Sequence, residues 1–185
     1  KSDLVEAYKK VQEEQARAEQ LLLNVLPEKV ATQLKENPDI IANSFPEVTV
    51  LFADIVDFTR LAHKFRPEII VGILNRIFST FDELAEKYGL EKIKTIGDAY
   101  MVVGGLPNPL KNHAEAVANF ALESMAQLKR FKLKTGDELT MRIGINTGPV
   151  VAGVIGKKRF IYDIWGDAVN LASRMESNSM PGVIQ

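Results

Sequence analysis

The chain has 185 residues, a length that suits one globular domain with an appended segment. Its 23 basic and 24 acidic side chains give a net charge of -1, so we expect no overall electrostatic attraction to nucleic acid or to an anionic membrane. The absence of cysteine excludes disulfides and thiolate zinc sites, and it is consistent with a reducing, cytoplasmic location.

The first segment has the pattern of a short coiled coil. Apolar residues recur there every seven positions, with Glu and Lys between them: Leu4, Val11, Ala18 and Val25. Pro27 interrupts the pattern, and residues 28–36 predict a second short helix. We interpret residues 1–44 as a helical coiled-coil and transducer segment; a solvated helix packed on its own domain is the alternative. The start lacks an initiator Met and a signal-peptide pattern, which leaves room for an upstream membrane or sensor domain in a longer parent chain.

From residue 48 the periodicity becomes that of an α/β domain. The predicted elements are a buried strand at 48–53, a helix at 67–88, strands at 91–95 and 99–103, a helix at 114–131, strands at 140–146 and 150–155, and a helix at 167–176. The two strands before residue 104 are joined by the tight Gly97-Asp98 turn, and the last two by Gly148-Pro149. This βαββαβ order predicts a ferredoxin-like α/β sandwich over residues 45–185, with an N-terminal helical extension.

Two aspartates stand where predicted strands end. Asp54 follows the first strand, and Asp98 lies in the turn between the next two. In this topology these strands are neighbours, so both carboxylates should converge at one edge of the sheet. Such a pair suits two hard cations, Mg²⁺ or Mn²⁺, which can clamp the attacking and leaving oxygens of a phosphoryl transfer. Either aspartate alone is more often a turn or capping residue. The two histidines, His63 and His113, have no partner motif and are expected at the surface.

Three long motifs follow one another along the chain. They are FADIVDFT at 52–59, KIKTIGDAYM at 92–101 and YDIWGDAVNLASRME at 162–176. Together they resemble the catalytic domain of the class III nucleotidyl cyclases, and the likeness runs from residue 48 to the C-terminus. The helical segment at 21–34 is similar to the coiled coil and transducer element upstream of many such domains.

The resemblance implies a role for each matching residue. Asp54 and Asp98 would hold two Mg²⁺ or Mn²⁺ ions, with the backbone carbonyl of Ile55 as a further ligand. The amides of the turn that opens a helix would face the triphosphate: Ile55, Val56, Asp57, Phe58 and Thr59. Asn170 would orient the ribose, and Arg174 would stabilise the pentavalent transition state. Their four-residue spacing places both on one helix face.

Lys94 and Asp163 match the pair that reads the purine edge. Adenine presents an acceptor at N1 and a donor at N6, which a lysine and an aspartate complement. Guanine reverses that edge, and the related guanylyl cyclases tend to carry Glu and Cys at these positions. The pair therefore favours ATP. The structural alternatives are a solvent-facing lysine in an alternating strand and an aspartate in a turn.

Two departures from the family pattern stand out. Asp57 occupies a position where many members have glycine, which places a carboxylate near the expected phosphate site. It either caps the following helix or lowers nucleotide affinity. The family's C-terminal strands and a phosphate-binding lysine would lie beyond Gln185, so the catalytic domain reads as C-terminally incomplete.

The sequence thus predicts an adenylyl cyclase, a phosphorus–oxygen lyase that converts ATP to 3′,5′-cyclic AMP and pyrophosphate. The ribose 3′-oxygen would attack the α-phosphorus in line, assisted by two metal ions. In the family, metal-binding and base-reading residues come from different subunits, so a chain with both sets is expected to form a homodimer with two shared sites. A guanylyl cyclase and a non-catalytic, dimerising nucleotide-binding regulatory module are the alternatives.

Overall fold

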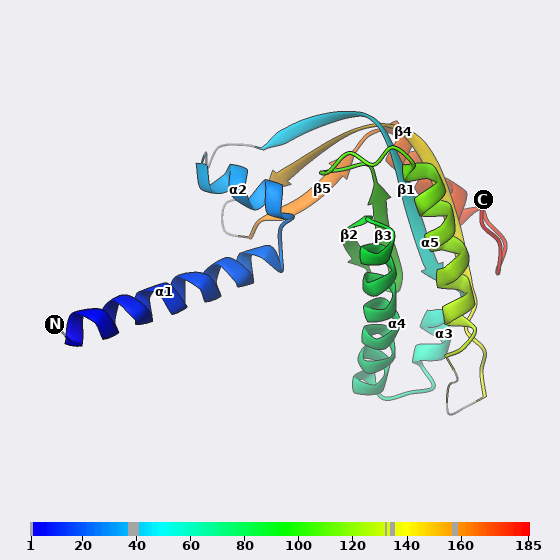
Figure 1. The fold of residues 1–185 in the computed structure, drawn as a ribbon. Coiled ribbons are helices and arrows are strands. Elements are labelled where there is room, and N and C mark those ends of the chain that lie inside the picture. Colours follow the sequence, from blue (N-terminus) through cyan, green and yellow to red (C-terminus); the bar gives the residue numbers. More distant parts are fainter. Residues whose placement is uncertain (1, 37–40, 132, 134–135, 157–158) are drawn as a thin grey trace. The chain divides into compact units, whose positions relative to one another are not determined.

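The computed structural model describes residues 2–36, 41–131, 133, 136–156 and 159–185 (Figure 1). Contacts between residues divide the chain into two compact units. The first joins Lys1–Ala42 to Gly153–Tyr162, and the second joins Asn43–Ala152 to Asp163–Gln185. No helix of the described residues is long and apolar enough to cross a membrane.

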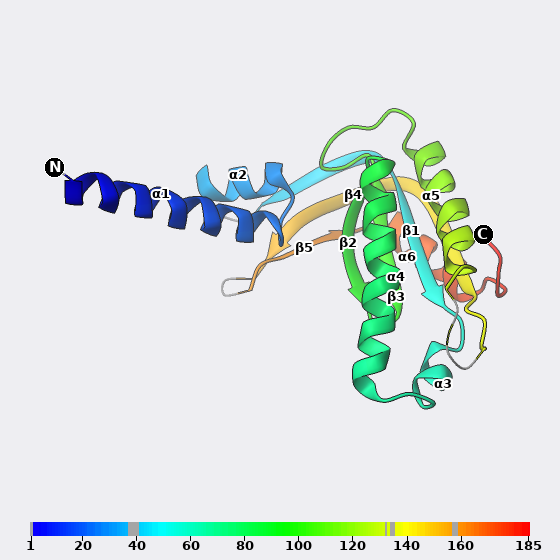
Figure 2. The same ribbon diagram turned by 60° about the horizontal axis from the view of Figure 1, so that its bottom comes forward.

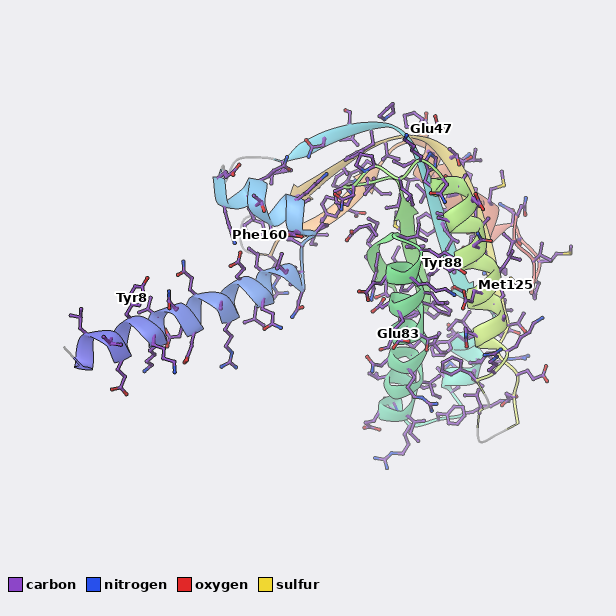
Figure 3. The ribbon with its side chains drawn as sticks, viewed as in Figure 1. Tyr8, Glu47, Glu83, Tyr88, Met125 and Phe160 are labelled. Atoms are coloured by element: carbon purple, nitrogen blue, oxygen red, sulfur yellow. The ribbon has the colours of Figure 1, made fainter. Side chains whose placement is uncertain are left out.

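The first unit is built on two helices, α1 (Ser2–Leu23) and α2 (Glu28–Glu36). Val30 and Ala31 bury the apolar face of α2, whereas the apolar stripe of α1 stays exposed. Tyr8, for example, is 66% exposed and extends from the side of α1 (Figure 3). Helix α1 therefore keeps an apolar surface that the other described residues of the first unit do not cover.

A five-stranded sheet with the order β2-β3-β1-β4-β5 has most of its residues in the second unit. The strands are β1 (Ala42–Ile55), β2 (Glu91–Ile96), β3 (Ala99–Gly104), β4 (Met141–Ile155) and β5 (Ile161–Trp165). The helices of this unit are α3 (Phe58–Ala62), α4 (Pro67–Lys87), α5 (His113–Leu128) and α6 (Asp167–Ser177). Strand β3 pairs antiparallel with both β1 and β2. The order of the first four strands confirms the predicted ferredoxin-like fold.

Helices α4 and α5 pack on each other and on the sheet (Figure 2), and an aromatic cluster fills the space between them. The ring of Phe81 meets that of Tyr100 edge-on, with 5.5 Å between centroids, and Phe120 stacks on Tyr100 at 6.1 Å. The Tyr100 hydroxyl donates a hydrogen bond to Asp82 at 2.7 Å, so its one polar atom is satisfied. This core fixes β1 and β3, the two strands that lead to the predicted metal edge.

The prediction of two strands around Gly148-Pro149 is wrong, because Met141 to Ile155 form the single strand β4. Gly148 serves close packing here and makes no turn: a Cβ at this residue would lie 3.0 Å from the Cβ of Ala168 on α6. Asp163, for which a turn was the structural alternative, lies in the additional strand β5 (Ile161–Trp165).

Helix α6 crosses β4 at Gly144 with almost no space between the two backbones. A Cβ at Gly144 would lie 2.0 Å from the backbone nitrogen of Glu176 and 2.3 Å from the carbonyl oxygen of Ala172. Backbone atoms cannot rotate away, so we expect Gly144→Ala to cost about 3 kcal/mol or more, the upper end of ordinary overpacking. Urea denaturation measures this loss. Gly72→Ala is the control, because Gly72 lies in α4 with open space around it and alanine favours helix by about 1 kcal/mol. Equal unfolding free energies for the two variants would contradict this packing.

Candidate active site

Asp54 and Asp98 meet at one edge of the sheet. Asp54 lies at the end of β1 and stands opposite Ala99 in the antiparallel register of β1 and β3. Asp98 immediately precedes Ala99 in the turn between β2 and β3, so the register itself brings the two carboxylates together. Both side chains are half-buried.

The electrostatics of this edge suit a bound cation. Burial raises the pKa of Asp98 above its ordinary value, and the negative charge of Asp54 raises it further. Two like charges in a partly desolvated place repel each other, and a divalent cation would relieve that repulsion. Among the described residues no group of three or more His, Cys, Asp or Glu side chains gathers as a metal site. A cation here would take its other ligands from backbone, water or substrate oxygens, as Mg²⁺ commonly does.

Arg142 and Glu176 also lie at this edge of the sheet. The sequence motifs did not identify either of them as a site residue. The Nη2 atom of Arg142 donates a hydrogen bond to Asp54 Oδ2 at 2.8 Å. Its Nε lies 3.2 Å from Oε1 of Glu176, near the end of α6. The hydrogen bond to Asp54 raises the pKa of Arg142, while burial and then the charge of Asp54 raise the pKa of Glu176. Arg142 stands between buried Met141 and Ile143, a pattern that sequence alone assigns to a solvent-facing residue.

An open cavity of about 510 Å³ lies against the two aspartates. Four of the five predicted phosphate-facing residues line it beside Asp54 and Asp98: Ile55, Asp57, Phe58 and Thr59. Val56 is the exception. Its backbone N–H donates to the carbonyl of Thr140 at 2.8 Å, so this amide is not free for a phosphate. The following helix, α3, has only five residues. The dipole of so short a helix is small, so individual backbone amides contribute more to phosphate binding here.

Asp57 adopts the left-handed conformation, with φ 57° and ψ 20°. Glycine enters this region without strain, and aspartate is one of the few other residues that tolerate it. The backbone thus explains why glycine suits this position. Asp57 occupies the N-cap position of α3, as the capping interpretation expects, but its side chain makes no hydrogen bond to the amides of this helix. Its carboxylate instead lies 3.5 Å from the guanidinium of Arg60.

Lys94 and Asp163 form an ion pair with each other, although their strands stand at opposite ends of the sheet order. The Lys94 side chain is 36% exposed and that of Asp163 only 16%. Asp163 uses its other oxygen, Oδ1, to accept the backbone N–H of Ile164 at 2.9 Å. The lysine therefore does not simply face solvent, and the aspartate is fixed in orientation.

Helix α6 carries the remaining two predicted residues. Asn170 and Arg174 lie on its exposed side, whereas Ala168, Ala172 and Glu176 are buried. The four-residue spacing thus places Asn170 and Arg174 on one face. Neither of them lines the cavity beside the aspartates. Lys94 and Asp163 do not line it either. Within one chain, these four predicted site residues therefore lie outside the cavity that the two aspartates line.

His113 does not belong to this site, and the expectation that it lies at the surface is wrong. It is 9% exposed, and its Nδ1 lies 2.7 Å from the hydroxyl of Thr49. The same hydroxyl is 2.7 Å from that of Thr147, so β1, β4 and α5 share a partly buried polar cluster. His63, in contrast, is exposed.

The sheet order, the helices α4 and α5 and the carboxylate edge define the catalytic-domain fold of the nucleotide cyclases. Residues 40–185 match the adenylate and guanylate cyclase catalytic domain, and the chain belongs to this family. The family includes both adenylate and guanylate cyclases among the relatives of this chain.

An adenylate cyclase of Mycobacterium tuberculosis is 49% identical over 184 residues, which is 99% of this chain and 42% of the relative. The rat guanylate cyclase soluble subunit beta-2 is 46% identical over 172 residues, covering 92% of this chain and 25% of that protein. The chain thus spans less than half the length of these curated relatives.

Two solved structures show the same fold. The catalytic core of a rhodopsin-guanylyl cyclase with converted specificity, in complex with ATPαS, has a TM-score of 0.74 and 43% identity. The match covers 77% of this chain and 78% of that one. The adenylyl cyclase CyaB from P. aeruginosa has a TM-score of 0.70 and 32% identity, covering 78% of this chain and 77% of that one.

Proposed function

We propose that this chain is the catalytic part of an adenylyl cyclase, which converts ATP to 3′,5′-cyclic AMP and pyrophosphate. The observation that carries the choice of ATP is the contact between Lys94 and Asp163. It places one hydrogen-bond donor beside one acceptor, and the N1 and N6 atoms of adenine need that combination. The relatives alone do not decide the base, because they include cyclases of both kinds.

The proposed reaction forms a bond between the ribose 3′-oxygen and the α-phosphorus, and it breaks the bond from that phosphorus to the bridging oxygen of pyrophosphate. The 3′-hydroxyl proton passes to solvent water as the oxygen attacks. Asp54, Asp98 and the carbonyl of Ile55 would hold two Mg²⁺ or Mn²⁺ ions, which lower the pKa of the hydroxyl and neutralise phosphate charge. Free amides of the 55–59 turn would bind the triphosphate.

Helix α6 supplies the other half of the proposed site. Asn170 would orient the ribose through its amide, and Arg174 would stabilise the charge that develops on the phosphoryl oxygens in the transition state. Both side chains lie on an exposed helix face, where a bound nucleotide can reach them. Correct orientation of the ribose matters because the attacking oxygen must stand in line with the leaving group.

We further propose a homodimer that shares two active sites. Lys94, Asp163, Asn170 and Arg174 do not line the cavity beside the aspartates, so a second copy would bring the missing half to each edge. The uncovered apolar stripe of α1 fits a parallel helix pair in the same dimer. One solved relative is described as a non-canonical dimeric guanylyl cyclase domain.

Purine choice gives the first test of this function. The wild-type chain, incubated with Mn²⁺ and either ATP or GTP, should form cyclic AMP and pyrophosphate faster than cyclic GMP. The double variant Lys94→Glu with Asp163→Cys should raise the ratio of kcat/KM for GTP to that for ATP by at least about 100-fold. The reason is that a purine edge that does not match the site leaves buried polar groups unpaired. Quantifying both cyclic products gives the ratio.

Lys92→Glu is the matched control for this test. Lys92 lies on the same strand and pairs with Asp82 at 2.8 Å, so Lys92→Glu repeats the lysine-to-glutamate change of the double variant at another position. The control should leave the GTP-to-ATP ratio unchanged. An unchanged ratio in the double variant would assign base choice to other residues. Nucleotide binding without any cyclic product from the wild-type chain would favour the non-catalytic regulatory module.

A further inference from the structure

A single guanidinium lies between two carboxylates at the metal edge. Arg142 on β4 reaches Asp54 on β1 through Nη2, at 2.8 Å, and Glu176 on α6 through Nε, at 3.2 Å. The Nε and Oε1 atoms are fully buried, but their approach lacks hydrogen-bond geometry. Charge, and not a well-formed hydrogen bond, therefore holds Glu176 beside Arg142.

The packing of helix α6 on strand β4 determines where Glu176 lies relative to Arg142. Helix α6 is seated on β4 at Gly144, where a Cβ would lie 2.0 Å from the Glu176 nitrogen. Gly144 and Arg142 are two residues apart on the strand, so they lie on the same face of the sheet. The Glu176 side chain is only 11% exposed. The close helix–strand crossing thus brings this carboxylate to the Nε atom of the guanidinium.

Because the guanidinium is planar, a contact at its Nε atom affects how its Nη2 atom meets Asp54. Nε and Nη2 belong to one rigid plane, so the ionic contact between Glu176 and Nε limits the directions in which Nη2 can point. Nη2 of Arg142 then donates its hydrogen bond to the Oδ2 atom of Asp54. Without Glu176, the guanidinium can turn toward the two-bond arrangement that arginine commonly makes with a carboxylate, which occupies both oxygens. A cation at this edge would then compete with Arg142 for Asp54.

We propose that Glu176 is a positioning residue that acts through Arg142 to keep the Asp54 carboxylate available to divalent cations. This inference rests on the proposed function, because that function assigns the Asp54 and Asp98 edge to the metal ions. Glu176 favours the binding of a cation at this edge in two ways. It restrains the competing guanidinium, and its own negative charge favours a cation nearby.

Direct Mn²⁺ binding tests this role without relying on activity. Electron paramagnetic resonance of free Mn²⁺, measured on the full chain without nucleotide, gives the Kd. Glu176→Gln is nearly isosteric, and we expect it to raise the Kd about 10-fold, the lower range for loss of a residue that supports a metal ligand. The Mn²⁺ concentration for half-maximal activity should rise in parallel. The kcat at saturating Mn²⁺ should stay within about twofold of wild type.

Two further variants separate positioning from general stability. Glu176→Asp keeps the charge on a shorter side chain and should restore part of the Mn²⁺ affinity. Glu123→Gln makes the same chemical change on α5, where Glu123 accepts hydrogen bonds from Lys87 and Tyr88, both at 2.6 Å, and it should leave the Kd unchanged. A purely structural Glu176 would lower the unfolding temperature and leave the Kd alone.

An unchanged Kd in folded Glu176→Gln overturns the inference, and so does an equal shift in Glu123→Gln. If Glu176→Gln does not fold, Glu176→Asp decides, and a wild-type Kd in that variant overturns the inference as well. Wild-type chain that binds no Mn²⁺ overturns the proposed metal site and this inference together. Wild-type binding that Glu176→Gln leaves unaltered overturns the inference alone.

Discussion

Asp98→Ala should lower the rate of cyclic nucleotide formation by at least about 100-fold, because the proposed metal contribution amounts to several kcal/mol of transition-state stabilisation. The same change should not destabilise the metal-free fold. Burial and the charge of Asp54 both raise the pKa of Asp98, so its ionised carboxylate is unfavourable in the absence of a cation. Loss of activity with unimpaired stability is the signature of a functional residue.

Cyclic product per minute and the urea unfolding curve, recorded in chelator, measure the two effects. Asp137→Ala is the matched control, since Asp137 forms an exposed ion pair with Lys64 at 2.9 Å. Such pairs contribute little stability, and the control should keep its activity. Near-normal activity in folded Asp98→Ala would remove this residue from the metal site. A marked loss of stability would point to a structural role.

Mixing two inactive variants should restore activity if the sites are shared. Asp98→Ala lacks the metal edge and Arg174→Ala lacks the transition-state cation, so each homodimer should be nearly inactive. A mixed dimer then has one site with both lesions and one site with neither. With random exchange, half of the dimers are mixed and each has one intact site, which predicts about a quarter of wild-type activity.

Subunit exchange must be shown independently, for example by energy transfer between differently labelled variants. Mixing Asp98→Ala with Asp54→Ala is the control. Both lesions lie on the same half of the site, so every mixed dimer stays inactive at both sites. Recovery in the first mixture alone supports the shared site. Exchange without recovery would mean that each site is built within one chain, contrary to the proposed dimer.

Local patterns predicted most of the fold. The apolar run of β1, the tight turn at Asp98 and the apolar faces of α4 and α5 depend on residues close in sequence, and each appeared where expected. The convergence of Asp54 and Asp98 also followed from the sequence, because antiparallel pairing of neighbouring strands fixes which residues face each other. The single long strand β4 did not follow, since glycine and proline usually mark a turn.

The cluster around Arg142 could not be predicted, because its members are distant in sequence and each has an ordinary local pattern. Arg142 alternates with buried residues as a solvent-facing strand residue does, and Glu176 sits in a helix where glutamate is common. Only the close approach of α6 to β4 at Gly144 turns these two charges toward each other. The same holds for His113, whose burial depends on β1 and β4.

The sequence by itself determined the family pattern, the order of the elements and the identity of the paired aspartates, because these depend on local spacing and strand register. The tertiary structure decided which charges surround those aspartates, that the Val56 amide bonds to Thr140, and that Lys94 meets Asp163. The physical reason is that ion pairs and buried hydrogen bonds join atoms that are close in space but far apart along the chain. Their partners are set by the packing of whole elements, as Gly144 sets the place of Glu176.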